Sequence, residues 1–209
     1  MKERPILFSG EMVRAILDDR KTMTRRVVKP PFEIHANGFI TRRRGNERLC
    51  PYACPYGKPG DRLWVRETWT YDNKEYVQTY KDEPWRGMPD IGTAEVYYRA
   101  TERTPDAFPR WRPSIFMPRW ASRITLEIAN VRVERLNDIS EEDAKREGVE
   151  SNFDEGVVYY GPLNKGHADA RIAFSWLWDS INAKRGYSWK SNPWVWVVEF
   201  ERIKEQGRG

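Results

Sequence analysis

The residues best able to do chemistry in this chain lie close together at positions 19–26, a segment that holds one lysine, two threonines and three arginines. Lys21 can act as a base, and Thr24, three residues later, supplies a hydroxyl; covalent catalysis uses this pairing when no histidine takes part. Basic residues near the end of a helix also complement its dipole, by roughly 0.3–1 kcal/mol each. The segment therefore predicts either a nucleophile with its base or a helix end with favourable charges.

An amphipathic helix is expected to hold this segment in place. Ser9 can cap its start, and Glu11 suits the first turn, where an acidic side chain faces the positive end of the helix dipole. Apolar residues then recur at helical spacing, at Met12, Val13, Ile16 and Leu17. One face of the helix should pack on the core, which positions Lys21 at its exit.

A second short helix is predicted within residues 138–148. Ser140 and Asp143 resemble a capping box, with Asp in the place of the usual Glu, and Gly148 can adopt the left-handed conformation that ends a helix. Glu147 then lies in the last turn, where a negative side chain meets the negative end of the helix dipole. Such a glutamate is either a tolerated surface residue of a charged helix or an acid with a partner elsewhere in the fold.

The basic residues are grouped, although the formal net charge is only +5, from 36 Lys and Arg against 31 Asp and Glu. Arginines beside exposed aromatic residues suit single-stranded nucleic acids, because they contact phosphates while the rings stack on bases. The candidate nucleic-acid contacts are Arg20, Arg25, Arg26, Arg42, Arg43, Arg44, Trp111 and Arg112. The alternatives are a solvated basic face and, for residues 110–120, a loop whose aromatic rings cap one end of the fold.

Length and composition favour a single elaborated domain over residues 1–209. Hydrophobic residues make up 39% of the chain, and ten Trp, ten Tyr and eight Phe supply large side chains for a core. No apolar run reaches transmembrane length, and the first residues lack the apolar core of a signal peptide. We therefore expect a cytoplasmic protein without membrane contact.

Two cysteines, Cys50 and Cys54, are expected to be free thiols in that reducing compartment. A zinc site would need both of them together with His35 or His167, which are far away in the sequence. The pair is thus a poor zinc candidate, and no cofactor is expected.

The remaining pattern predicts an α+β fold. Alternating or β-prone runs predict strands at residues 4–8, 62–67, 94–100, 122–133 and 194–200, and a helical apolar face predicts a helix over 170–182. The strand at 122–133 should be central and should carry an irregularity at Asn130. Stretches rich in turn formers near 27–58, 72–118 and 151–168 are expected to be insertions.

Taken together, these parts resemble the ASCH family, a branch of the PUA-like β-barrels, and particularly its phage and prophage members. The resemblance rests on the opening strand and helix, residues 20–24 at the helix exit, the turn and strand at 59–65, residues 139–148 and the closing strand. It implies a mixed β-barrel flanked by short helices, with long loop insertions. The family's Gly-x-Lys motif is met by Asp19-Arg20-Lys21, in which Asp replaces the glycine, and Asp can occupy the left-handed conformation at modest cost.

The resemblance also implies an activity. Small bacterial ASCH proteins similar to this chain hydrolyse N4-acetylcytidine with a lysine, a threonine and a glutamate, which would correspond to Lys21, Thr24 and Glu147. In that scheme Lys21 activates the Thr24 hydroxyl against the acetyl carbonyl, and Glu147 assists proton transfer to the leaving amine. The partner would be RNA or a modified nucleoside. A non-catalytic RNA-binding module and a ribonuclease are the alternatives.

Overall fold

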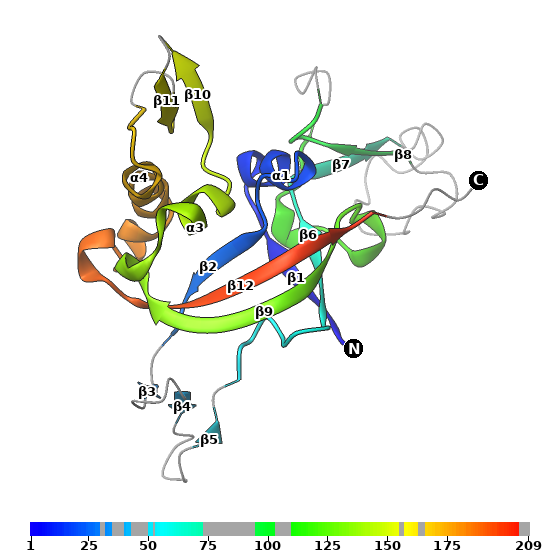
Figure 1. Ribbon diagram of the computed structural model, residues 1–209. Helices are drawn as coiled ribbons and strands as arrows, with labels where there is room; N and C mark the ends of the chain where they lie inside the picture. Colours follow the sequence, from blue (N-terminus) through cyan, green and yellow to red (C-terminus); the bar gives the residue numbers. More distant parts are fainter. Residues whose placement is uncertain are drawn as a thin grey trace.

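The centre of the molecule is a curved five-stranded mixed sheet (Figure 1). The computed structural model describes residues 1–29, 32–34, 40–42, 50–51, 53–72, 95–102, 110–154, 157–162 and 166–204. In spatial order the strands are β1 (Glu3–Leu7), β6 (Arg62–Arg66), β9 (Thr125–Arg135), β12 (Trp194–Ile203) and β2 (Met23–Val27). β1 and β6 run parallel and the other neighbours are antiparallel. The chain is therefore α+β, as predicted, with β9 in the middle of the sheet.

The predicted barrel is not closed. β1 and β2 are the two edges of the sheet, and within the described residues no strand ladder joins them. One side chain crosses between these edges instead: Arg26 of β2 donates from Nη2 to the carbonyl oxygen of Leu7 in β1, at 2.7 Å. The curvature that the resemblance implied is present, but the continuous backbone pairing of a barrel is replaced by this side-chain contact.

In the part of the chain that the structure describes, three α-helices pack on the sheet, namely α1 (Gly10–Leu17), α3 (Glu141–Arg146) and α4 (Ala170–Asn182). Their caps follow the sequence signals, because Ser9 accepts from the Met12 amide and Ser140 from the Asp143 amide. Single 3₁₀ turns are η2 (Ser114–Phe116), η3 (Arg119–Ala121), η4 (Leu136–Asp138), η5 (Ala183–Arg185) and η6 (Trp189–Ser191). In the described part of the chain no helix has the length and apolar character needed to cross a bilayer.

Both faces of β12 are buried, which explains its continuous apolar sequence. Val198 and Phe200 pack in one cluster with Val13 and Ile16 of α1. Val195 and Val197 lie in a second cluster with side chains from α3 and α4, among them Ala144, Phe174 and Trp178. The alternation along one strand thus determines which helix lies on which face.

The strand irregularity predicted at Asn130 is present. Glu199 of β12 is opposite Asn130, whereas the next residue, Phe200, is opposite Ile128. Ala129 is therefore the extra residue of a β-bulge, which increases the local twist of the two long strands.

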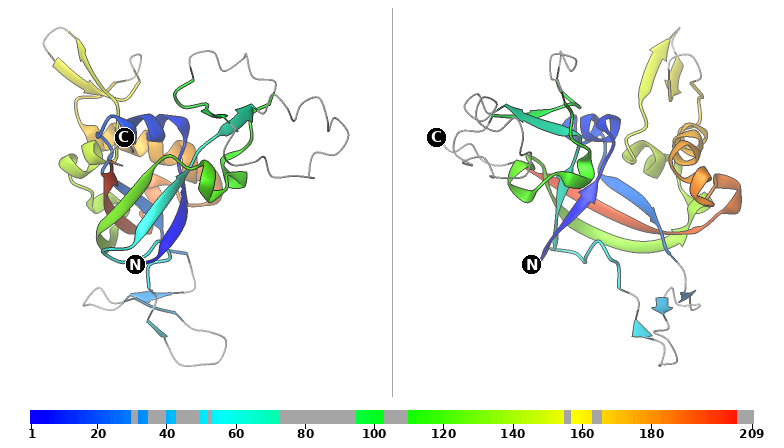
Figure 2. Two further views of the ribbon diagram at one scale, coloured as in Figure 1. Left: turned by 90° about the vertical axis from the view of Figure 1, so that its right-hand side faces the viewer. Right: turned by 180° about the vertical axis from the view of Figure 1, so that it is seen from behind.

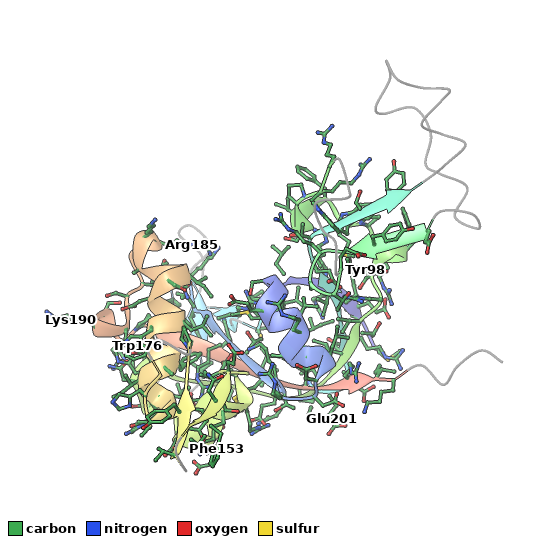
Figure 3. All side chains as sticks on the ribbon, turned by 90° about the horizontal axis from the view of Figure 1, so that it is seen from above. Tyr98, Phe153, Trp176, Arg185, Lys190 and Glu201 are labelled. Carbon is green, nitrogen blue, oxygen red and sulfur yellow. The ribbon has the colours of Figure 1, made fainter. Side chains whose placement is uncertain are left out.

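Small accessory sheets project from this body (Figure 2). They are the sheet of β3 (Glu33–Ile34), β4 (Ile40–Arg42) and β5 (Cys50–Pro51), the hairpin of β7 (Trp69–Asp72) and β8 (Glu95–Tyr98), and the hairpin of β10 (Ser151–Asp154) and β11 (Val157–Tyr160). The last of these corrects the expectation of an irregular loop at 151–168, because the β-prone residues 157–160 pair with 151–154. Seen from above, Phe153 and Trp176 lie on one side of α1 and Tyr98 lies on the other (Figure 3).

The close approach of α3 to the exit of α1 depends on Gly148. It has φ +84°, and a Cβ there would lie 2.8 Å from the Lys21 Cβ and 2.9 Å from the Ala15 Cβ. We expect Gly148→Ala to lower the free energy of unfolding by about 2–4 kcal/mol, the sum of left-handed strain and overpacking. Urea unfolding measures this loss.

Gly186 is the matched control for this substitution. It has nearly the same φ, +85°, but nothing lies within 4 Å of its added Cβ, so Gly186→Ala should cost only about 1–2 kcal/mol of backbone strain. Equal losses in the two variants would contradict the close approach of α3 to the Lys21 segment.

Candidate functional site around Lys21 and Glu147

The chain turns sharply between α1 and β2, and this turn aims Lys21 into the protein. Asp19, in the place of the glycine of the family motif, adopts the left-handed conformation, with φ +57°. The Lys21 amide donates to the Ala15 carbonyl at 2.9 Å, and the Thr22 amide donates to the Arg146 carbonyl, also at 2.9 Å. The backbone on either side of the Lys21 side chain is therefore tied to α1 and to α3.

Lys21 and Glu147 meet as a buried ion pair. The Nζ atom of Lys21 donates to Oε2 of Glu147 and to the Glu147 backbone carbonyl, each at 2.7 Å. The two side chains are 0% and 3% exposed. The sequence allowed two interpretations of Glu147, a surface residue or an acid with a partner elsewhere. The structure shows the second, because Glu147, at the end of α3, is the partner of Lys21.

The surroundings lower the pKa of Lys21. Burial lowers the pKa of Lys21, the Glu147 carboxylate opposes this effect, and the nearby Arg26 and Arg25 guanidinium groups add to the lowering. A lowered pKa increases the fraction of the lysine that is neutral at a given pH, and the neutral amine is the form that can accept a proton.

Thr24 lies on β2 on the same strand face as Arg26, since strand residues two apart share a face. It is 3% exposed and is paired with Val198, which packs in the same cluster as Phe8. Among the described residues, the Thr24 hydroxyl has no hydrogen-bond partner. Within that part of the chain, the hydroxyl is therefore unpaired but nearly closed off from solvent.

The Phe8 ring brings Lys21 and Arg26 together. Its centroid is 5.7 Å from the Lys21 Nζ and 5.1 Å from the Arg26 Cζ. The Nε–H of Arg26 is buried and has no acceptor within the described part of the chain. Neither Phe8 nor the orientation of Arg26 was signalled by the sequence, because both depend on how the two sheet edges approach each other.

Arg25 does not fit the predicted role of a nucleic-acid contact. Its side chain is 0% exposed, because alternation along β2 turns it to the face opposite Arg26. There it pairs with Glu134, Asp143 and Glu147 at 2.5, 2.8 and 3.4 Å. Three carboxylates leave this guanidinium no surface for a phosphate.

The other predicted nucleic-acid contacts are dispersed. Arg20 is exposed beside α1 and pairs with Asp18 at 3.1 Å. Arg42 lies in β4, in the small sheet on the other side of the main sheet from α1 (Figure 1). The side chain of Arg42 is not among those described, and Arg43 and Arg44 lie outside the described residues. The described members of this group of candidate contacts therefore do not lie together on one exposed surface.

Arg112 contacts a separate aromatic cluster at the β7–β8 hairpin, and Trp111 precedes it in the chain. Arg112 donates to the Tyr71 hydroxyl at 3.0 Å, and its guanidinium lies over the rings of Trp69 and Tyr71. Trp111 is half-buried. This arrangement matches the alternative interpretation, in which the aromatic residues of this loop cap one end of the fold.

No metal site is visible in the described residues, among which no group of three or more potential ligands gathers. Cys54 is a free, half-buried thiol, and burial raises its pKa. An open cavity of about 410 Å³ lies at the start of α1, lined by Ser9, Gly10, Glu11, Arg14, Thr68, Arg99 and Ala100. It is at the opposite end of α1 from Lys21 and does not include the Lys21–Glu147 pair.

Comparison of the chain with protein-family models, with curated proteins and with solved structures found no match. The case for a functional site therefore rests on the geometry around Lys21 and on the residues themselves.

The buried pair predicts a pH-dependent loss of stability when Glu147 is removed. Glu147→Gln leaves the Lys21 ammonium without its anion, which should cost about 3–5 kcal/mol at neutral pH. Without the carboxylate the folded-state pKa of Lys21 falls further below that of the unfolded chain, so the unfolded state binds more protons and stability rises with pH. The deficit relative to wild type should shrink toward about pH 9.5, just below the ordinary lysine value.

Urea unfolding at about pH 6.5 and about pH 9.5 measures this dependence. Glu134→Gln is the control, because Glu134 contacts Arg25 but not Lys21, and its deficit should not be relieved at high pH. A Glu147→Gln deficit that is the same at both pH values would show that Lys21 is not the group left unpaired.

Proposed function

We propose that this protein is an amidohydrolase that cleaves an N4-acylated cytidine or a closely related acylated nucleobase. The single observation that carries the proposal is the buried pairing of Glu147 with Lys21, which lies three residues before Thr24 on the same short segment. The resemblance to ASCH amidohydrolases points to the same three residues. It supports the proposal independently of the coordinates.

Stability alone is a poor reason to bury a lysine. Replacing a buried ion pair by apolar residues of similar volume is often neutral, or stabilising by about 1–4 kcal/mol. Lys21 is nevertheless fully buried, with its amine 5.7 Å from the centre of an aromatic ring. Burial lowers the pKa of this lysine, and a lowered pKa is what a lysine that acts as a base requires, which supports a chemical role for the pair.

In the proposed first step, the neutral amine of Lys21 accepts the proton of the Thr24 hydroxyl as the Thr24 oxygen attacks the acyl carbonyl carbon. A C–O bond forms, and the carbonyl oxygen becomes an oxyanion. The buried, unpartnered Nε–H of Arg26 lies on the Thr24 face of β2 and is the donor that would stabilise this oxyanion. Arg26 is thereby moved from a predicted nucleic-acid contact to a proposed substrate contact.

Collapse of this intermediate breaks the bond between the acyl carbon and N4. The proton held by Lys21 and Glu147 passes to the leaving nitrogen, which departs as an amine, and the acyl group remains as an ester on Thr24. Water then attacks the ester with Lys21 again as base, which releases the carboxylic acid and restores Thr24. Because Lys21 is buried and Arg26 is only half-buried, the proposal places substrate entry beside Arg26.

Thr24 offers a clean test of this function. Thr24→Val keeps the shape of the side chain and removes the hydroxyl, whereas Thr24→Ser keeps the hydroxyl. With N4-acetylcytidine and its deoxy analogue as substrates, we expect Thr24→Val to lose at least about 10²-fold in kcat and Thr24→Ser to retain most of it. Chromatography of released cytidine or deoxycytidine, with the melting temperature of each variant, measures the effect.

Lys21→Met and Glu147→Gln should be as inactive as Thr24→Val if the three residues act as a unit. Turnover by Thr24→Val at the wild-type rate would refute a threonine nucleophile. A wild-type protein that binds RNA but releases no product from either substrate would favour the non-catalytic RNA-binding module, and shortening of the RNA would favour the ribonuclease.

A further inference from the structure

Arg25 touches the proposed site from the face of β2 opposite Thr24. Its Nη1 atom donates to Oε1 of Glu147 at 3.4 Å, while Lys21 takes the other oxygen, Oε2, at 2.7 Å. The two oxygens of one carboxylate are thus divided between two cations. Both cations have fully buried side chains.

The guanidinium of Arg25 is itself held from several elements. Nε and Nη2 donate to Oε1 of Glu134 on β9, at 3.0 and 2.5 Å, and Nη2 donates to Oδ2 of Asp143 on α3, at 2.8 Å. Nη1 also contacts the Met23 sulfur at 3.2 Å. A planar group with this many fixed contacts has essentially one position, which a flexible lysine would not maintain.

We propose that Arg25 is a positioning residue of the site: it fixes Oε1 of Glu147 so that Oε2 faces the Lys21 amine. An effect of Arg25 on catalysis rests on the proposed function, whereas its effect on the geometry of the Lys21–Glu147 pair does not. Arg25 lies on the far face of β2 from Thr24, and its only described contact with the proposed reacting groups is the one with Glu147.

The charges that face Lys21 determine the sign of the expected effect. Glu147 from α3 stabilises its ammonium form, while Arg26 and Arg25 from β2 destabilise it. Glu134 on β9 and Asp143 on α3 face Arg25 rather than Lys21. Removing Arg25 takes away one repelling cation and leaves the Glu147 carboxylate to Lys21 alone, and both changes raise the pKa of Lys21.

Arg132 provides a matched control. It contacts two of the same carboxylates as Arg25, with Nε 3.0 Å from Glu134 Oε2 and Nη2 2.5 Å from Asp143 Oδ2, and it also pairs with Glu199. It makes no described contact with Glu147 or Lys21. Arg132→Met therefore perturbs the same ion-pair network without touching the pair itself.

The test is an NMR titration of the Lys21 side chain, followed at its 13Cε resonance, in the intact protein without substrate. The resonance is assigned by its loss in Lys21→Met. We expect an upward shift of the Lys21 pKa in Arg25→Met, a smaller shift in Arg25→Lys, which keeps a cation, and no shift in Arg132→Met. Equal shifts in Arg25→Met and Arg132→Met, or no shift in either, would overturn the proposal. If Arg25→Met does not fold, Arg25→Lys against Arg132→Lys decides by the same criterion.

A second readout connects the role to catalysis. Where the wild type releases cytidine, Arg25→Met should lower kcat at neutral pH about tenfold for each unit by which the Lys21 pKa rises, and should regain activity at alkaline pH with little change in KM. A loss that is equal at all pH values would assign Arg25 a merely structural role. If the wild type releases no product, the proposed function fails, while the titration still decides whether Arg25 acts on Lys21.

Discussion

The burial of one ammonium group determines how this protein is assembled. A lysine removed from water requires an anion and hydrogen-bond acceptors close by, because an unpaired buried charge costs several kcal/mol. The anion comes from a residue 126 positions later in the chain, Glu147 at the end of α3. That contact forces α3 onto the turn after α1, a turn that needs Asp19 in the left-handed conformation and Gly148 without a side chain. Local backbone features at both ends of the pair thus follow from one electrostatic requirement.

A network of half-buried carboxylates supports this pair. Glu134, Asp143 and Glu199, which are 15–19% exposed, are shared among Arg25, Arg132 and Arg146. Isolated exposed pairs contribute only about 0–1 kcal/mol each, so the number of pairs is a poor measure of stability. The pairs matter more for geometry than for stability. Each shared carboxylate joins side chains from different elements, so one network of ion pairs links β2, β9, β12 and α3. Part of the 32% of charged residues in this chain therefore serves these internal ion pairs rather than an exposed binding surface.

Sequence signals that act locally predicted most of the fold. The caps at Ser9 and Ser140, the period of Ala170–Asn182 and the β-prone run at the end of the chain predicted elements that the structure contains, because each depends on neighbours a few residues away. The open sheet edge, the β10–β11 hairpin and the burial of Arg25 were missed. Each depends on contacts across long sequence distances, such as the 109 residues between Arg25 and Glu134. Lys21 and Thr24 stood out by residue type alone, whereas the partner of Lys21 was identified only through a family resemblance.

The position of β2 explains how one short segment can hold both a proposed reacting group and its support. Residues 24 and 26 face the Phe8 side of the strand, while residues 23 and 25 face α3 and β9. Lys21 lies before the first paired residues of β2, which are Met23 and Glu199. The alternation of the strand therefore does not determine to which face the Lys21 side chain points. Its long side chain reaches the carboxylate held from the α3 side, and its amine still lies near the ring on the other side. A long side chain just outside an edge strand can therefore connect two faces that the pleat of the sheet otherwise keeps apart.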